Sequence, residues 1–146
     1  MKFSTIYLTI SFCLNFINCR SQQPITDERA MVELQHFYIS YIKEASQIGT
    51  KHYRRVDSLL RRYGTAKLIT QLKEEDEADY DFFLNTNGPQ IESANTVQVF
   101  KDNKEKDIYV VSFVYYHEPF EKDEIIRIKL RLIKTSTGIL IDRIVR

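Results

Sequence analysis

Apolar residues recur at steps of three and four through the first half of the chain, and this spacing predicts helices. Thr26 can accept a hydrogen bond at a helix start, where Asp27 and Glu28 suit the positive end of the helix dipole. The apolar stripe that follows, flanked by Phe37, consists of Met31, Leu34, Tyr38, Tyr41, Ile42 and Ala45. We expect one helix that buries this stripe and ends before Gly49.

The same spacing predicts two further helices. In the second helix, the side chains expected to face the core are Tyr53, Val56, Leu59, Leu60 and Tyr63, and those expected to face mostly outward are Arg54, Arg55, Arg61 and Arg62. Gly64 ends this helix, and Thr65 begins a short third helix through Leu68, Ile69 and Leu72. An acidic run at 74–77 then precedes an apolar segment at 79–84.

After Pro89 the apolar residues change to a period of two, which is typical of strands. Four candidate strands lie at 96–100, 107–117, 126–132 and 139–145. The second is apolar on both faces, as a central strand would be, whereas the third has one apolar and one basic face. About three helices followed by about four strands predict an α+β fold, with the helices packed on a curved antiparallel sheet within one domain at 26–146.

The first 18 residues have the pattern of an export signal. Lys2 precedes about fifteen uncharged, mostly apolar residues, fewer than the ~20 that a membrane-spanning helix needs. This run ends at Phe16-Ile17-Asn18-Cys19, which is similar to the bacterial lipobox, where the signal is removed before a lipidated Cys. The competing cleavage site needs small residues in an Ala-x-Ala-like pattern, and no Ala occurs before Ala30.

We therefore expect the signal at 1–18 to be removed, Cys19 to carry acyl chains, and residues 19–25 to form a polar tether. The chain would then be a membrane-anchored lipoprotein of the cell envelope that faces the periplasm. Soluble secretion, or a soluble periplasmic location, is the alternative.

Composition and residue spacing argue against several classes of function for this chain. The 21 Lys and Arg residues nearly balance the 20 Asp and Glu residues, so no basic excess favours nucleic acid. Both cysteines, Cys13 and Cys19, lie in the N-terminal segment, so the folded body would have no thiol for catalysis or a disulfide. His36, His52 and His117 show no metal-binding spacing, and no Gly-rich phosphate loop occurs. The sequence therefore predicts no metal and no cofactor.

Three segments resemble a family of small exported bacterial proteins that is known only as a domain of unknown function. These segments are 63–69 (YGTAKLI), 79–87 (DYDFFLNTN) and 138–144 (GILIDRI). The resemblance covers most of residues 27–146, and it implies a cone-shaped fold similar to nuclear transport factor 2, also called cystatin-like. Such folds host enzymes, binders and toxin-neutralising proteins alike, so the resemblance implies a fold and not an activity.

Tyrosines and one acidic segment supply the candidate functional side chains. A Tyr combines apolar area with a polar tip, so it can line a pocket or an interface. The candidates for this role are Tyr38, Tyr41, Tyr53, Tyr63, Tyr109 and Asp81. Burial beside the apolar 82–84 segment could raise the pKa of Asp79 or Asp81 and create a general base. The alternative is a turn cap, in which the carboxylate accepts backbone N–H bonds. Asp142, in the last strand, would pair with Arg127, Arg131 or Arg143 if it faced the core.

Taken together, these features favour an exported, lipid-anchored binding module without catalytic activity. Its most specific version is an immunity protein that neutralises a toxin, by analogy with proteins of similar fold. One alternative is a ligand-binding or small enzymatic cone with acid–base chemistry in an apolar pocket, and another is a structural envelope lipoprotein. The arginines of the second helix and the acidic residues at 74–81 suit either the steering of a protein partner or a solubilising surface.

Overall fold

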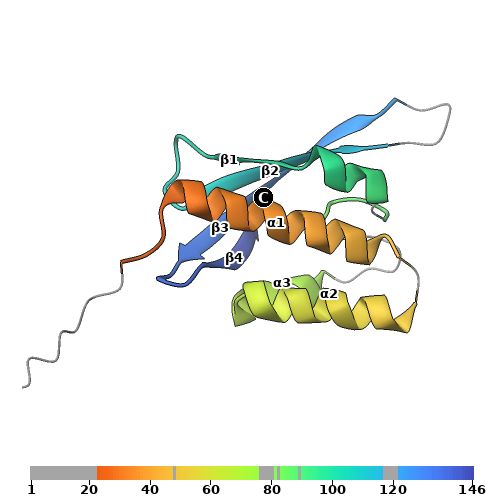
Figure 1. The fold of residues 1–146 in the computed structure, drawn as a ribbon, viewed down its shortest axis with the longest axis horizontal. Coiled ribbons are helices and arrows are strands. Elements are labelled where there is room, and N and C mark those ends of the chain that lie inside the picture. Colours follow the sequence, from red (N-terminus) through yellow and green to blue (C-terminus); the bar gives the residue numbers. More distant parts are fainter. Residues whose placement is uncertain (1–22, 48, 76–80, 82, 89, 117–121) are drawn as a thin grey trace, which may run out of the picture.

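The structure is a computed structural model of the chain, and it describes residues 23–47, 49–75, 81, 83–88, 90–116 and 122–146. The expected export signal and Cys19 lie outside these residues. The elements, in chain order, are α1 (Asp27–Ala45), α2 (Thr50–Tyr63), α3 (Ala66–Glu74), the 3-10 helix η1 (Ile91–Thr96), β1 (Gln98–Lys101), β2 (Ile108–Tyr115), β3 (Glu124–Lys134) and β4 (Ile139–Val145) (Figure 1).

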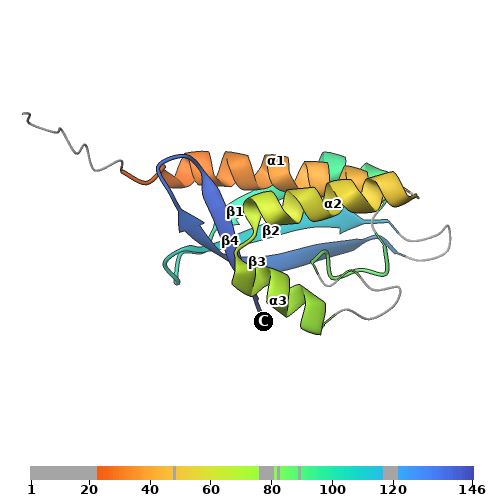
Figure 2. The ribbon, with the colours of Figure 1, turned by 90° about the horizontal axis from the view of Figure 1, so that it is seen from below.

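The four strands form one antiparallel sheet in the order β1-β2-β3-β4, so each strand pairs with its neighbour in sequence. Helix α1 lies along one face of this sheet, and α2 runs beside α1 (Figure 2). The α+β class and the packing of helices on a four-stranded antiparallel sheet are therefore confirmed. The prediction of β2 as an inner strand is also confirmed.

Helix α1 begins where the sequence predicts it. The Thr26 hydroxyl accepts a hydrogen bond from the backbone N–H of Arg29 at 3.3 Å, which satisfies a free donor of the first turn. The buried residues of α1 are Ala30, Leu34, Phe37, Tyr38, Tyr41 and Ile42. Phe37, predicted only to flank the stripe, is almost completely buried because α2 covers that side of α1.

Helix α2 is more exposed than its apolar pattern suggests. None of its described side chains is fully buried, and Val56, Leu59, Leu60 and Tyr63 are only partly covered. The prediction that Tyr53 faces the core is wrong, because this side chain is 75% exposed. Tyr53 lies in the first turn of α2, level with the last turn of α1, where the described residues offer no core to cover it.

Helix α3 protects the outer edge of β4. The backbone N–H of Thr65 donates to the carbonyl of Ile141 at 3.0 Å, and the Thr65 hydroxyl donates to the carbonyl of Asp142 at 3.1 Å. The Gln71 amide then accepts from the N–H of Ile144 at 3.1 Å and donates to the same residue's carbonyl. These bonds satisfy backbone groups that an open edge would offer to another chain.

The pairing of β3 with β4 shifts between Arg131 and Leu132, and Asp142 is the extra residue at this bulge. The bulge turns Asp142 toward α3, where its carboxylate lies 3.7 Å from the Lys67 ammonium. The expected pairing of Asp142 with a strand arginine is therefore wrong. Arg143 instead lies directly opposite Arg131.

Candidate functional site

Aromatic side chains fill the space between α1 and the 81–86 turn. The Phe37 ring lies 5.6 Å from both the Tyr38 and Phe83 rings, edge to face in each case. Tyr38 stacks on Phe83 at 5.1 Å, and Tyr41 approaches Phe83 at 4.9 Å. Because Phe37, Tyr38 and Phe83 are almost completely buried, their rings pack the interior as a core rather than line an open pocket.

Asp81 belongs to this aromatic cluster. Its Oδ1 accepts hydrogen bonds from the backbone N–H groups of Phe83 and Leu84, both at 2.9 Å, and its Oδ2 accepts from the Tyr41 hydroxyl at 3.1 Å. Burial raises the pKa of Asp81, and these three hydrogen bonds oppose the rise because they favour the carboxylate. Burial, together with the nearby Asp81 carboxylate, also raises the pKa of Tyr41. Oδ1 caps the turn and Oδ2 joins it to Tyr41 of α1, which fits a turn cap better than a general base.

The structure therefore brings together only part of the predicted set. Tyr38, Tyr41 and Asp81 meet in the aromatic cluster, and Tyr63 touches its edge, with its ring 5.0 Å from that of Phe37. Tyr109 lies elsewhere: its hydroxyl donates to Asp27 at 2.6 Å. Tyr53 belongs to neither group, and Asp79 lies outside the described residues.

Asp27 is the centre of a charged cluster that joins α1 to the sheet. Its carboxylate accepts hydrogen bonds from Lys101, Lys134 and the Tyr109 hydroxyl, which come from β1, β3 and β2. The hydrogen bonds from the two ammonium groups hold the pKa of Asp27 well below its usual range. Burial, with the bond to the Asp27 carboxylate, raises the pKa of Tyr109. Sequence reasoning found only the helix-dipole role of Asp27, because these partners lie at least 74 residues away.

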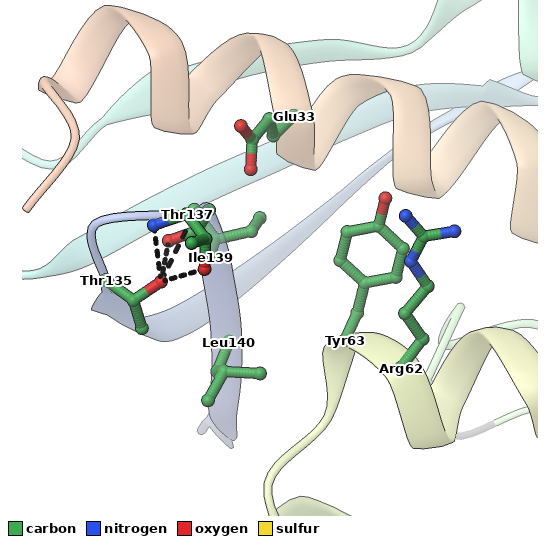
Figure 3. A pocket seen from close by; sticks show the side chains of 8 residues that line it. Glu33, Arg62, Tyr63, Thr135, Thr137, Ile139 and Leu140 are labelled. Atoms are coloured by element: carbon green, nitrogen blue, oxygen red, sulfur yellow. Dashed lines mark hydrogen bonds between the residues drawn. The ribbon is translucent and has the colours of Figure 1, made fainter.

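A groove of about 560 Å³ opens between α1, the end of α2 and the turn that joins β3 to β4. We call it the helix–turn groove, and its lining residues are Glu33, Arg62, Tyr63, Thr135, Thr137, Gly138, Ile139 and Leu140 (Figure 3). Glu33 points from α1 toward the turn, while Arg62 and Tyr63 rise from the end of α2. Of these residues, sequence reasoning named only Tyr63 as a candidate, because the others come from three separate segments.

The sheet face away from α1 carries both apolar and basic side chains. We call it the outer sheet face. Phe100, Ile125 and Ile133 are 52%, 56% and 45% exposed. The basic residues on this face are Arg127, Lys129, Arg131 and Arg143. Part of this face is hollowed into a cleft of about 520 Å³, whose lining includes Phe100, Ser112, Ile125 and Arg127.

The basic side chains of the outer sheet face are poorly neutralised. Lys129 pairs with Asp102 at 3.4 Å, but Arg127, Arg131 and Arg143 form no ion pair with any described residue. The Nε atoms of Arg131 and Arg143 are buried without a hydrogen-bond acceptor in the described part of the chain. Arg131 and Arg143 are also direct cross-strand neighbours on β3 and β4, so two like charges lie next to each other on the outer sheet face.

Other candidate chemistry is sparse. His36 is exposed, His52 Nδ1 lies 3.1 Å from the Glu44 carboxylate, and His117 lies outside the described residues. Within the described ranges, no three His, Cys, Asp or Glu side chains gather as a metal site would require. None of the helices in these ranges has the length and apolar character to cross a membrane.

Comparisons with known proteins give one informative match. No protein-family model matches the chain, and no curated protein matches it. Among solved structures, the chain is similar to the 2.10 Å crystal structure of a protein of unknown function from Bacteroides thetaiotaomicron VPI-5482. That similarity has a TM-score of 0.72 at 21% sequence identity, and it covers 82% of this chain and 90% of that chain. At this identity, the match shows the fold alone.

Proposed function

We propose that this chain is an exported, lipid-anchored binding module, and that its outer sheet face docks an acidic protein partner. The carrying observation is a set of guanidinium groups that form no ion pair with a described residue and lie beside exposed apolar side chains on the sheet face opposite α1. Aromatic and Arg side chains are enriched at the centres of protein interfaces, where an acidic partner would neutralise the excess charge. In its most specific form, the proposal is that this chain is an immunity protein and that its partner is the toxin it neutralises.

The charge of the outer sheet face argues for a different protein as partner rather than a second copy. A two-fold dimer through this face would bring Arg127, Arg131 and Arg143 of each copy near the same residues of the other copy. Like charges placed together at an interface cost several kcal/mol. An acidic surface on another protein removes this repulsion.

We also infer that the fold is the cone-shaped type similar to nuclear transport factor 2. The order of three helices before an antiparallel sheet supports this assignment. The enzymatic alternative has less support, because Asp81 uses Oδ1 to cap its own turn and Oδ2 to accept from Tyr41 of α1, and it does not line either of the grooves described above.

A charge reversal on the outer sheet face tests the docking proposal. We expect the full chain, solubilised in detergent, to retain one specific acidic protein from envelope and secreted fractions, and Arg127→Glu to weaken retention about tenfold or more. Raised salt should weaken retention of the partner by the original chain as well. The measurement is the amount retained on the immobilised protein, quantified across a range of salt concentrations.

Arg54→Glu is the matched control, because Arg54 is exposed on α2, forms no ion pair with a described residue, and gives the same change in charge. This variant should retain the partner as well as the original chain does. Equal retention by both variants would overturn the docking proposal, and so would the absence of any specific partner, which would favour a purely structural envelope role.

The lipid anchor has a separate test. Cys19→Ser removes the thiol that would be acylated, so the protein should move from the membrane fraction to the soluble fraction. Several acyl chains hold a protein firmly, because each buried methylene contributes about 0.8 kcal/mol. The measurement is fractionation of cells followed by detection of the protein, with Cys13→Ser as the control that should leave the fractionation pattern unchanged. Unchanged membrane association of Cys19→Ser would contradict lipidation.

A further inference from the structure

The two ends of the helix–turn groove carry opposite charges. Glu33 supplies a carboxylate from α1, and Arg62 supplies a guanidinium from the last turn of α2 (Figure 3). The groove is also lined by the polar side chains of Tyr63 and Thr137 and by the apolar side chains of Ile139 and Leu140. We propose that this groove binds a small zwitterion that carries one carboxylate and one amine, as an amino acid or a short peptide does.

The carboxylate of Glu33 is available for a ligand. Its Oε1 accepts from Arg29 Nε at 3.0 Å, but its Oε2 has no hydrogen-bond donor among the described residues. Glu33 is only 24% exposed, and its carboxylate lies against Gly138 of the turn. A ligand ammonium could donate a charge-assisted hydrogen bond to Oε2.

The absence of a side chain at Gly138 leaves space for the Glu33 carboxylate in the groove. A Cβ atom at position 138 would lie 2.7 Å from Glu33 Oε2, closer than a carbon and an oxygen can approach without a shift. The glycine therefore allows the carboxylate to lie against the turn, where Thr135 Oγ1 accepts from the N–H of Gly138 at 3.1 Å and holds the backbone.

The guanidinium of Arg62 is also available. It lies over the Tyr63 ring, 5.5 Å from the ring centroid, and it forms no ion pair with a described residue. This contact orients the side chain beside the groove while its N–H groups remain free. Guanidinium groups bind carboxylates through two parallel hydrogen bonds, so Arg62 suits the acidic end of a zwitterion.

The size of the groove and its apolar wall favour a ligand of about two residues. A volume of about 560 Å³ lies in the usual range for small-molecule sites, and Leu140 offers contact area to an apolar side chain. The charged residues of this site differ from those of the outer sheet face: Glu33 and Arg62 line the groove, whereas the arginines of the outer sheet face are Arg127, Arg131 and Arg143. A small ligand here would therefore be a further property of the chain and would not test the docking of a protein partner.

Titration with a dipeptide and its blocked forms tests the proposal. The probe is alanyl-leucine, compared with its N-acetyl form, which lacks the ammonium group, and its C-terminal amide, which lacks the carboxylate. We expect the full chain to bind alanyl-leucine, measured by calorimetry or by NMR shifts of groove residues, and each blocked form to bind at least tenfold more weakly. Absence of binding at 10 mM alanyl-leucine, or equal binding of all three probes, would overturn the proposal.

Two variants assign the ends of the ligand. Arg62→Gln should weaken binding of alanyl-leucine about tenfold yet leave the weak binding of the C-terminal amide unchanged, because that probe has no carboxylate to lose. Glu33→Gln should show the reverse pattern, with the N-acetyl form unaffected. Arg61→Gln is the matched control, since Arg61 pairs with Asp57 at 2.7 Å and does not line the groove. If either groove variant weakened the binding of all three probes equally, the assignment of Arg62 to the carboxylate and Glu33 to the ammonium would be wrong.

Discussion

Replacing Phe37 by alanine should lower the free energy of unfolding by about 3–5 kcal/mol, the usual range for removing a buried aromatic ring. Phe37 is almost completely buried, and its ring contacts four other aromatic rings, those of Tyr38, Tyr41, Tyr63 and Phe83. The neighbouring rings are rigid and cannot rearrange to fill the space left by Ala. A cavity would therefore remain between α1, α2 and the 81–86 turn. Urea denaturation followed by circular dichroism measures the change.

Phe100→Ala is the matched control for this prediction. It removes the same atoms from the outer sheet face, where the Phe100 ring is 52% exposed and has little surface to lose. We expect a loss of less than about 1 kcal/mol for this variant, as for most surface substitutions. If Phe37→Ala cost no more than Phe100→Ala, the aromatic cluster would not be the core that the packing indicates.

Local patterns were enough to predict the elements of this fold. Thr26 and Thr65 were predicted to begin helices, and both hydroxyl groups accept backbone hydrogen bonds at helix starts. The apolar residues of β3 were predicted to form one buried face of the strand, and Ile126, Ile128 and Leu130 are buried. These features depend on residues a few positions apart, so they are visible in the sequence.

Features that depend on contacts between distant segments could not be predicted in this way. Tyr53 has the spacing of a core residue, but its exposure is decided by where α1 ends. Asp27 meets partners on three strands because the sheet register brings them to the start of α1.

The two proposed binding surfaces were missed for the same reason. The arginines of α2 were considered as a basic face, yet Arg55 and Arg61 are paired with nearby acids. Arg127, Arg131 and Arg143 of β3 and β4 form no ion pair with a described residue, but in the sequence the alternation of basic and apolar residues was interpreted as an ordinary solvent-exposed strand face. Only the structure shows that α1 covers the opposite face of the sheet and that α3 packs against β4.

Asp27→Asn should lower the free energy of unfolding at pH 7 by about 2 kcal/mol, since hydrogen bonds to charged groups contribute about 1.5–3 kcal/mol each and this site is partly solvated. The amide keeps the shape of the side chain, but it leaves Lys101 and Lys134 without their carboxylate partner. It also removes a negative charge from the first turn of α1, where such charges stabilise a helix. Urea denaturation at a series of pH values measures the loss.

The pH dependence of the stability difference shows whether Asp27 stabilises the fold through its charge or through packing of its side chain. The Lys101 and Lys134 ammonium groups hold the pKa of Asp27 below the ordinary value of 3.8, so the stabilisation from its carboxylate is fully present above about pH 4 and is lost as the pH falls further. The difference in stability between the original chain and Asp27→Asn should therefore be constant from about pH 5 to 8 and shrink toward pH 2. Asp81, whose pKa is raised by burial, gives the opposite slope, but it does so in both proteins and cancels in their difference.

Asp57→Asn provides the control for the loss of one carboxylate. Asp57 pairs with Arg61 one turn further along α2, where both side chains are more than half exposed, so its removal should cost less than about 0.5 kcal/mol. If the two Asn variants lost the same stability at pH 7, the Asp27 cluster would be an ordinary surface pair. If the loss at Asp27 were unchanged at pH 2, it would come from packing rather than from the charge that ties α1 to three strands of the sheet.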